Sequence, residues 1–145
     1  MTDTLKRYLE IKEQMSKYFS TKNGFFFAFN KEVFVKGQKE IQKHGWLTPD
    51  DKLISFGSGG YTVRRAFDKM KAFMADCDKQ IASECSAQEV YNYMYGNFES
   101  DYAADGDLQA MRVVLQHFGK DKLSEIKRGQ CAYYSVDDII NNKKE

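Results

Sequence analysis

The stretch KLISFGSGGYTVRRAF, Lys52 to Phe67, decides the fold. Its apolar run Leu53–Phe56 has the length and composition of a short strand, and it enters a glycine-rich turn, Gly57-Ser58-Gly59-Gly60. A stripe of apolar residues at three- and four-residue steps then extends from about Val63 to Ser83. The stretch predicts a strand, a tight turn and a long amphipathic helix, and it leaves residues 61–63 open between strand and helix start.

Upstream of this stretch, the sequence predicts two helices with a strand between them. The helices cover Asp3 to Phe19 and Lys31 to His44, and Asn30 caps the second. The strand is Gly24-Phe25-Phe26-Phe27-Ala28-Phe29, which we expect to be buried on both faces, or on one face with a partner covering the other. Gly37 costs its helix about 1 kcal/mol relative to alanine, which suggests close packing there against another backbone.

Downstream of the long helix, the sequence predicts several shorter ones. Ser86-Ala87-Gln88-Glu89 is a capping box that starts a helix. Ala104-Asp105-Gly106 predicts a turn, after which Asp107 caps another helix that Gly119 ends. The remaining segments are a short helix over Asp121–Arg128, an ambiguous stretch at 131–134, a last helical turn from Ser135 to Ile140, and a polar tail at 141–145.

These elements predict a mostly helical α+β fold, with five to six helices and a small sheet of two or three short strands. The length of 145 residues is typical of one domain. No internal repeat, low-complexity tract or linker interrupts the sequence. We therefore expect a single globular domain over residues 1–145 with a frayed tail.

Composition excludes several classes of protein. The net charge of +1 argues against a strongly electrostatic partner, so nucleic acid and anionic membranes are not expected. No apolar run is long enough to cross a membrane, and the N-terminal residues MTDTLKRYLEIKEQ lack the apolar region of a secretory signal. The three cysteines, an odd number, indicate reduced thiols and a cytoplasmic protein.

The glycine-rich turn is the first candidate ligand site. Successive glycine N–H groups cradle anions in some proteins, and nearby arginines add charge-assisted hydrogen bonds. The candidate ligand-binding residues are Gly57, Ser58, Gly59, Gly60, Arg64 and Arg65. The stretch matches neither the Walker A motif nor the dinucleotide-binding motif. A hairpin or strand-to-helix turn that needs positive φ explains the same residues, and the sequence favours that interpretation.

An acidic cluster is the second candidate. Glu99, Asp101, Asp105 and Asp107 lie close in sequence, and paired carboxylates perform acid–base chemistry in some enzymes. The sequence argues against a calcium loop, because Ala103 and Arg112 stand where the template requires ligands. Capped turns account for these carboxylates more simply.

The sequence predicts no metal or cofactor. Cys77, Cys85 and Cys131 have no zinc-ligand spacing, and His44 and His117 fall at predicted helix C-termini, where a partly positive imidazole suits the helix dipole. No nucleophile is supported by neighbouring residues, so we assign no catalytic residue.

Aromatic residues are the third candidate, because Tyr, Trp and Phe are enriched at protein interfaces. The candidate partner-binding residues are Phe26, Trp46, Tyr93, Tyr95, Tyr133 and Tyr134. Basic residues over 120–128 followed by Tyr133 and Tyr134 also suit nucleic acid, but the near-zero net charge makes that the weaker interpretation.

Three segments together resemble small proteins of unassigned function from phages and gut bacteria. They are Gly24–Phe29 with its following helix, Leu53–Gly60, and Tyr91–Glu99. An Asn-His-Glu motif goes with such proteins, and Asn97-Phe98-Glu99 departs from it by lacking the histidine. The resemblance implies a small cytosolic protein of mobile-element origin, and it implies no activity.

The sequence therefore favours a non-enzymatic protein-interaction module, for example a phage or mobile-element accessory or anti-defence factor that binds a host protein. One alternative is a small-ligand protein that holds a nucleotide or other anion in the loop at residues 57–65. The other is an enzyme that uses the acidic cluster at residues 99–107. The sequence predicts no particular oligomeric state.

Overall fold

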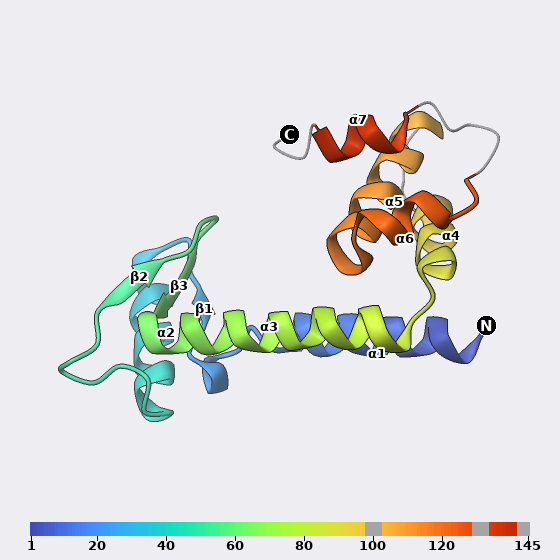
Figure 1. Ribbon diagram of the computed structural model, residues 1–145. Helices are drawn as coiled ribbons and strands as arrows, with labels where there is room; N and C mark the ends of the chain where they lie inside the picture. The colour runs from blue at the N-terminus through green and yellow to red at the C-terminus, as the bar shows by residue number, and fades with distance from the viewer. Residues whose placement is uncertain (98–102, 129–133, 142–145) are drawn as a thin grey trace. The chain divides into compact units, whose positions relative to one another are not determined.

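The structure, a computed structural model, describes residues 1–97, 103–128 and 134–141 (Figure 1). In these residues it has seven α-helices, one short 3-10 helix and one three-stranded antiparallel sheet. The predicted mostly helical α+β fold with a small sheet is confirmed. None of the described helices combines the length and apolar character needed to cross a membrane.

The chain divides into two compact units, which we describe separately. The sheet unit comprises Lys12–Cys77, and the helical unit comprises Met1–Ile11 together with Asp78–Glu145. Two helices, α1 (Asp3–Lys17) and α3 (Arg64–Glu84), contribute residues to both units. The single domain expected over residues 1–145 stays a prediction.

A hairpin forms the centre of the sheet unit. Strands β2 (Leu53–Ser55) and β3 (Gly60–Val63) pair antiparallel, with Ile54 opposite Thr62. The turn between them needs positive φ, which Gly57 adopts at 100° and Gly59 at 80°. The hairpin interpretation of the glycine-rich stretch is therefore confirmed, residues 61–63 are strand, and α3 begins directly after them.

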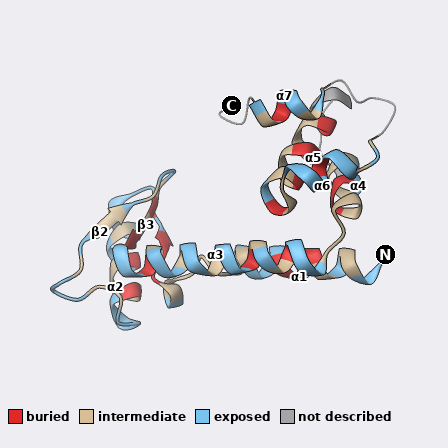
Figure 2. Ribbon diagram, viewed as in Figure 1, coloured by how far each residue is buried: buried red, intermediate tan, exposed pale blue. Residues whose placement is uncertain are grey.

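The third strand, β1 (Phe26–Phe27), is shorter than expected and lies at one edge of the sheet. The strand order is β1-β3-β2, so β3 is central, and Figure 2 shows it mostly buried. Gly24, with φ of 87°, is the C-terminal cap of the 3-10 helix η1 (Thr21–Asn23), and the strand therefore starts later than expected. Burial on both faces, the first of our two expectations for this strand, is wrong because Phe27 is 47% exposed.

Helix α2 (Lys31–Lys43) packs on one face of this sheet, and Asn30 caps it as predicted by accepting a hydrogen bond from the Val33 N–H at 2.9 Å. Gly37 permits the contact, because a Cβ added there would lie 2.2 Å from Cδ2 of Phe26. The close packing expected at Gly37 is thus against an aromatic ring rather than a backbone.

The sheet unit has a second apolar cluster on the opposite face of the sheet. Phe25, Val63 and Ala66 are buried there. The ring of Phe25 meets the rings of Phe19 and Phe56 edge-on, at centroid distances of 5.2 and 5.3 Å. Alternation along the strand therefore sends Phe25 to one cluster and Phe26 to the other.

The helical unit packs four helices around one core. They are α4 (Ala87–Asn97), α5 (Ala103–Phe118), α6 (Lys120–Glu125) and α7 (Val136–Asn141). The buried core residues are Tyr91, Ala110, Met111, Val114, Leu123 and Ile139. The ends of α1 and α3 that belong to this unit are joined by Arg7, whose Nε lies 3.2 Å from Oε1 of Glu84.

One expectation for the helical unit is wrong. Gly106 and Asp107 do not form a turn and a cap, because α5 already begins at Ala103 and includes both. The Asp107 side chain is fully buried, and it accepts hydrogen bonds from the Tyr91 hydroxyl at 2.7 Å and from Nε of Arg128 at 3.0 Å. These tertiary partners satisfy the carboxylate that local sequence statistics assign to a cap.

Candidate functional site

The predicted anion-binding loop and its arginines lie at opposite ends of β3, and the site stays a prediction. Gly57–Gly60 forms the hairpin tip, and Arg64 follows the far end of β3. At the rise of an antiparallel strand, the four steps from Gly60 to Arg64 span roughly 13 Å.

Arg65 has a structural role. Its guanidinium donates to both carboxylate oxygens of Asp51, at 2.9 and 2.8 Å, and to the carbonyls of Gly45 and Trp46, each at 3.1 Å. The same group lies 5.3 Å from the centroid of the Trp46 ring. The hydrogen bonds from Arg65, with others from Thr48, lower the pKa of Asp51. This network secures the segment before β2 to the start of α3.

The predicted partner-binding aromatics are divided between the two units, and their role as a partner-binding surface stays a prediction. Phe26 is only 5% exposed and belongs to the core beneath α2. Trp46 is half-buried, and its Nε1 donates to the Lys22 carbonyl at 2.8 Å. In the helical unit, Tyr93, Tyr95 and Tyr134 are also half-buried. Tyr133 lies outside the described residues.

The acidic cluster provides no catalytic arrangement among the described residues. Glu99 and Asp101 fall outside them, as does the side chain of Asp105. Asp107 is engaged by Arg128, and this pairing raises the pKa of the arginine. Within residues 1–97, 103–128 and 134–141, no group of three or more His, Cys, Asp or Glu side chains is placed to hold a metal ion.

The cysteines and histidines of the described residues also have structural surroundings. Cys77 is buried, and burial raises the pKa of the half-buried Cys85, so neither thiol has the environment of a nucleophile. Cys131 lies outside the described residues. His117 occupies the last turn of α5 as predicted, with Nδ1 2.8 Å from Oδ1 of Asp78, and His44 is the C-terminal cap of α2.

An exposed apolar surface on the sheet unit is the feature that packing does not explain. The described residues include five large apolar side chains classed as exposed, and four of them lie within nine consecutive positions. These are Phe27 at 47%, Phe29 at 85%, Val33 at 42% and Val35 at 39% exposed. We call Phe27, Phe29 and Val33 the aromatic edge.

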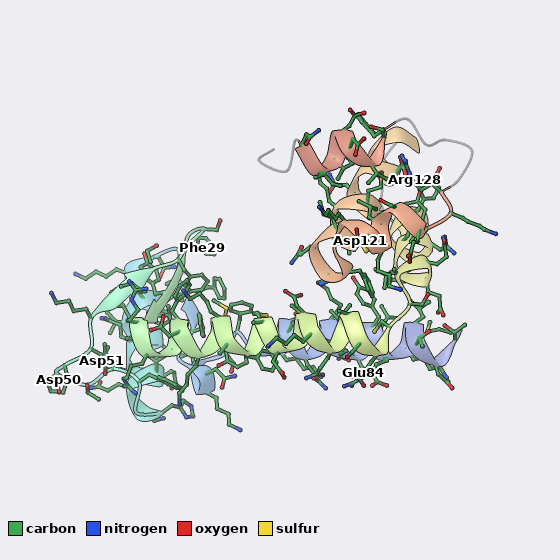
Figure 3. All side chains as sticks on the ribbon, in the orientation of Figure 1. Phe29, Asp50, Asp51, Glu84, Asp121 and Arg128 are labelled. Carbon is green, nitrogen blue, oxygen red and sulfur yellow. The ribbon has the colours of Figure 1, made fainter. Side chains whose placement is uncertain are left out.

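The phenylalanines of the aromatic edge each contact a neighbouring group of the sheet unit. The Phe29 ring rests on the hairpin turn, since a Cβ added to Gly59 would lie 2.7 Å from Cε1 of Phe29 (Figure 3). The Phe27 ring meets the Phe56 ring edge-on at 5.5 Å. A positioned and exposed aromatic side chain loses little conformational entropy on binding, which favours its use in recognition.

The backbone at Phe27 is also available to a partner. In an antiparallel pair, residues that bond the neighbouring strand alternate with residues whose N–H and C=O point away from it. The Ala28 N–H donates to the Gly59 carbonyl at 2.9 Å, and Phe27 stands opposite Gly60. Phe27 therefore directs its N–H and C=O to the open edge of the sheet, where no described residue bonds either group.

A groove of about 330 Å³ runs beside this open edge. Its apolar lining includes Phe19 and Phe27, and α2 contributes Val33, Lys36 and Glu40. A neighbouring hollow of about 470 Å³ shares Lys36 and Glu40 and adds Lys39, Gln42 and Lys43. The aromatic edge is thus continuous with a concave surface that follows α2.

Sequence reasoning selected Phe26 on this strand and missed Phe27, Phe29 and Val33. In the predicted strand Gly24–Phe29, alternation of side chains places Phe25, Phe27 and Phe29 on one face, and this pattern could have identified Phe27 and Phe29 from the sequence. Comparison with protein-family models, with curated proteins and with solved structures finds no match to this chain.

Proposed function

We propose that this protein is a non-enzymatic protein-binding module that accepts an extended segment of a partner along the open edge of β1. The observation that carries the proposal is the concentration of exposed apolar side chains in the aromatic edge, at Phe27, Phe29 and Val33. Contiguous exposed apolar surface on a folded protein is typical of an interaction site. The partner's apolar side chains bury Phe27, Phe29 and Val33.

The open backbone at Phe27 supports an extended partner. Peptides that add to an exposed sheet edge gain affinity from main-chain hydrogen bonds and specificity from pockets for alternate side chains. Phe27 offers one outward N–H and one outward C=O, and the adjoining groove receives side chains. An uncovered edge strand that carries no charge or proline at Phe26–Phe27 is otherwise a liability for aggregation.

Site-specific photo-crosslinking tests this proposal. The photoreactive residue p-benzoylphenylalanine replaces Phe27 or Phe29, and as a matched control it replaces Ala72, an exposed residue of α3 outside the groove. In an extract of cells that express the protein, we expect a discrete adduct from positions 27 and 29 and none from position 72. Val33→Glu should remove the adduct from position 29.

Two results contradict the proposal. An adduct of equal yield from position 72 indicates non-specific contact. No adduct from either position 27 or position 29 means that the aromatic edge contacts no partner in that extract.

A further inference from the structure

The charge of this protein is divided between its two units. The residues of the sheet unit include 12 basic and 7 acidic side chains, a net charge of +5. The residues assigned to the helical unit include 10 basic and 14 acidic side chains, a net charge of −4. The overall charge of +1 conceals this division. The unit that carries the aromatic edge is therefore the basic one.

Part of this positive charge lies at the groove. Lys36 lines both the groove and the neighbouring hollow, and Lys39 lines the hollow. Both are exposed, and neither forms an ion pair with any described residue. The acidic side chain in these linings is Glu40, which lies 3.7 Å from Nζ of Lys43. The concave surface beside the aromatic edge thus presents two unpaired ammonium groups.

We infer that the partner segment is an acidic peptide, with apolar side chains that contact Phe27 and Val33 and carboxylates that contact Lys36 and Lys39. This inference rests on the proposed function and adds the chemistry of the partner. Complementary charge at the rim of an apolar contact directs association and selects among partners. The lysines make contacts of this kind.

A protein segment fits this surface better than a nucleic acid. The Phe27 backbone presents a carbonyl as well as an N–H, and a phosphodiester backbone has acceptors but no N–H donor for that carbonyl. Val33 adds an aliphatic contact that gives no stacking with a base. The experiment must therefore distinguish peptide binding from nucleic-acid binding.

Fluorescence anisotropy with defined probes tests the inference. The probes are short labelled peptides in which leucine alternates with glutamate, glutamine or lysine, and a single-stranded oligouridine of similar length. We expect the glutamate peptide to bind most tightly and its affinity to fall as salt is raised. Lys36→Glu/Lys39→Glu should weaken it about tenfold, as expected for two reversed rim charges.

A matched variant controls for overall charge. Lys12→Glu/Lys52→Glu makes the same change in net charge at exposed residues that line neither hollow, and it should leave the affinity within about twofold. Phe29→Ser/Val33→Ser should weaken all peptides that bind, because it removes the apolar contact common to them. This apolar variant reports on the proposed function, and the lysine variant reports on the preference for acid.

The outcomes are distinguishable. Equal binding of the three peptides, lost in the apolar variant alone, overturns the acidic partner and leaves the proposed function in place. If oligouridine binds more tightly than every peptide, and Lys36→Glu/Lys39→Glu abolishes that binding, the inferred acidic peptide is overturned in favour of nucleic acid. Equal weakening by the two double-lysine variants assigns the effect to net charge and overturns the local role of Lys36 and Lys39. If no probe binds, the inferred preference of this surface for short acidic peptides is overturned. The proposed function is then decided separately by photo-crosslinking.

Discussion

The two units of this protein differ in which side chains they bury and which they expose. The helical unit buries charge, with Asp107 fully buried and the Arg128 side chain only 14% exposed. The sheet unit exposes apolar groups, with Phe29 85% exposed while Phe25 four residues earlier is 1% exposed. Hydrogen-bond partners within the helical unit account for the buried charge, whereas no packing within the sheet unit accounts for the exposed aromatic side chain. The comparison therefore favours the sheet unit as the location of the proposed interaction.

The largest expected effect separates two phenylalanines that flank β1, Phe25 and Phe29. Phe25→Ala should destabilise the protein by about 4 kcal/mol, because it empties a buried site among three aromatic rings. Phe29→Ala should change stability by no more than about 0.5 kcal/mol. Urea unfolding followed by circular dichroism measures both. Phe29→Ala should nevertheless abolish the photo-adduct from position 27. A large loss of stability in Phe29→Ala would assign this ring to packing and remove the basis of the aromatic edge.

The buried ion pair of the helical unit should give the next effect. Arg128→Ala leaves the Asp107 carboxylate buried with the Tyr91 hydroxyl alone among the hydrogen-bond donors described here, and should destabilise the protein by about 3 kcal/mol. Lys127→Ala, at the exposed neighbouring position, is the matched control and should stay within about 0.5 kcal/mol. Thermal unfolding measures the difference. If the two variants unfold alike, the pair contributes no net stability. Neither should alter the photo-adduct from position 29.

A pair of helical glycines offers a smaller contrast between the units. Gly37→Ala should destabilise by about 1–2 kcal/mol, because the added Cβ overlaps the Phe26 ring and this overpacking exceeds the gain in helix propensity. Gly96→Ala in α4 should stabilise by about 0.5–1 kcal/mol, since among the described residues no atom beyond the neighbouring residues and the backbone of α4 lies within 4 Å of the added Cβ. Chemical denaturation of both variants measures the opposite signs. Stabilisation by both would show that Phe26 moves easily, and that α2 does not depend on close approach.

The sequence predicted those features that depend on residues close together in the chain. Period and capping located the helices, and the expected caps at Ser86 and Ser135 accept hydrogen bonds from the N–H groups of Glu89 and Asp138, at 3.3 and 3.0 Å. Only half of the predicted capping box forms, because the Glu89 carboxylate instead accepts from the hydroxyls of Thr2 and Thr4.

Features that depend on distant partners were not predictable in the same way. Asp107 has the local context of a turn and cap, and the arginine that engages it lies 21 residues later. In residues 25–29, alternation of side chains fixes which phenylalanines share a face, but coverage of that face depends on α3 and the hairpin. Neighbouring elements bury Phe25 but leave Phe29 exposed, and the sequence of residues 25–29 alone does not predict this difference. The charge division likewise depends on which residues fold into each unit.

The smallest expected effect concerns the ion pair that secures the loop of the sheet unit. The pKa of Asp51 is lowered in the folded protein by hydrogen bonds from Arg65 and Thr48, so the folded state binds fewer protons than the unfolded state in mildly acidic solution. The stabilising contribution is therefore complete above the ordinary carboxyl pKa of about 4 and is lost as pH falls below it. Asp51→Asn removes the contribution, so its unfolding midpoint should lie below that of the original protein at neutral pH and approach it in acid. Asp50→Asn, one position earlier on an exposed side chain, should run parallel to the original protein across the same range. If the unfolding midpoint of Asp51→Asn instead lies below that of the original protein by the same amount at every pH, the Asp51 side chain stabilises the fold through neutral hydrogen bonds. The sheet unit, unlike the helical unit, would then rely on no charge pairing for this loop.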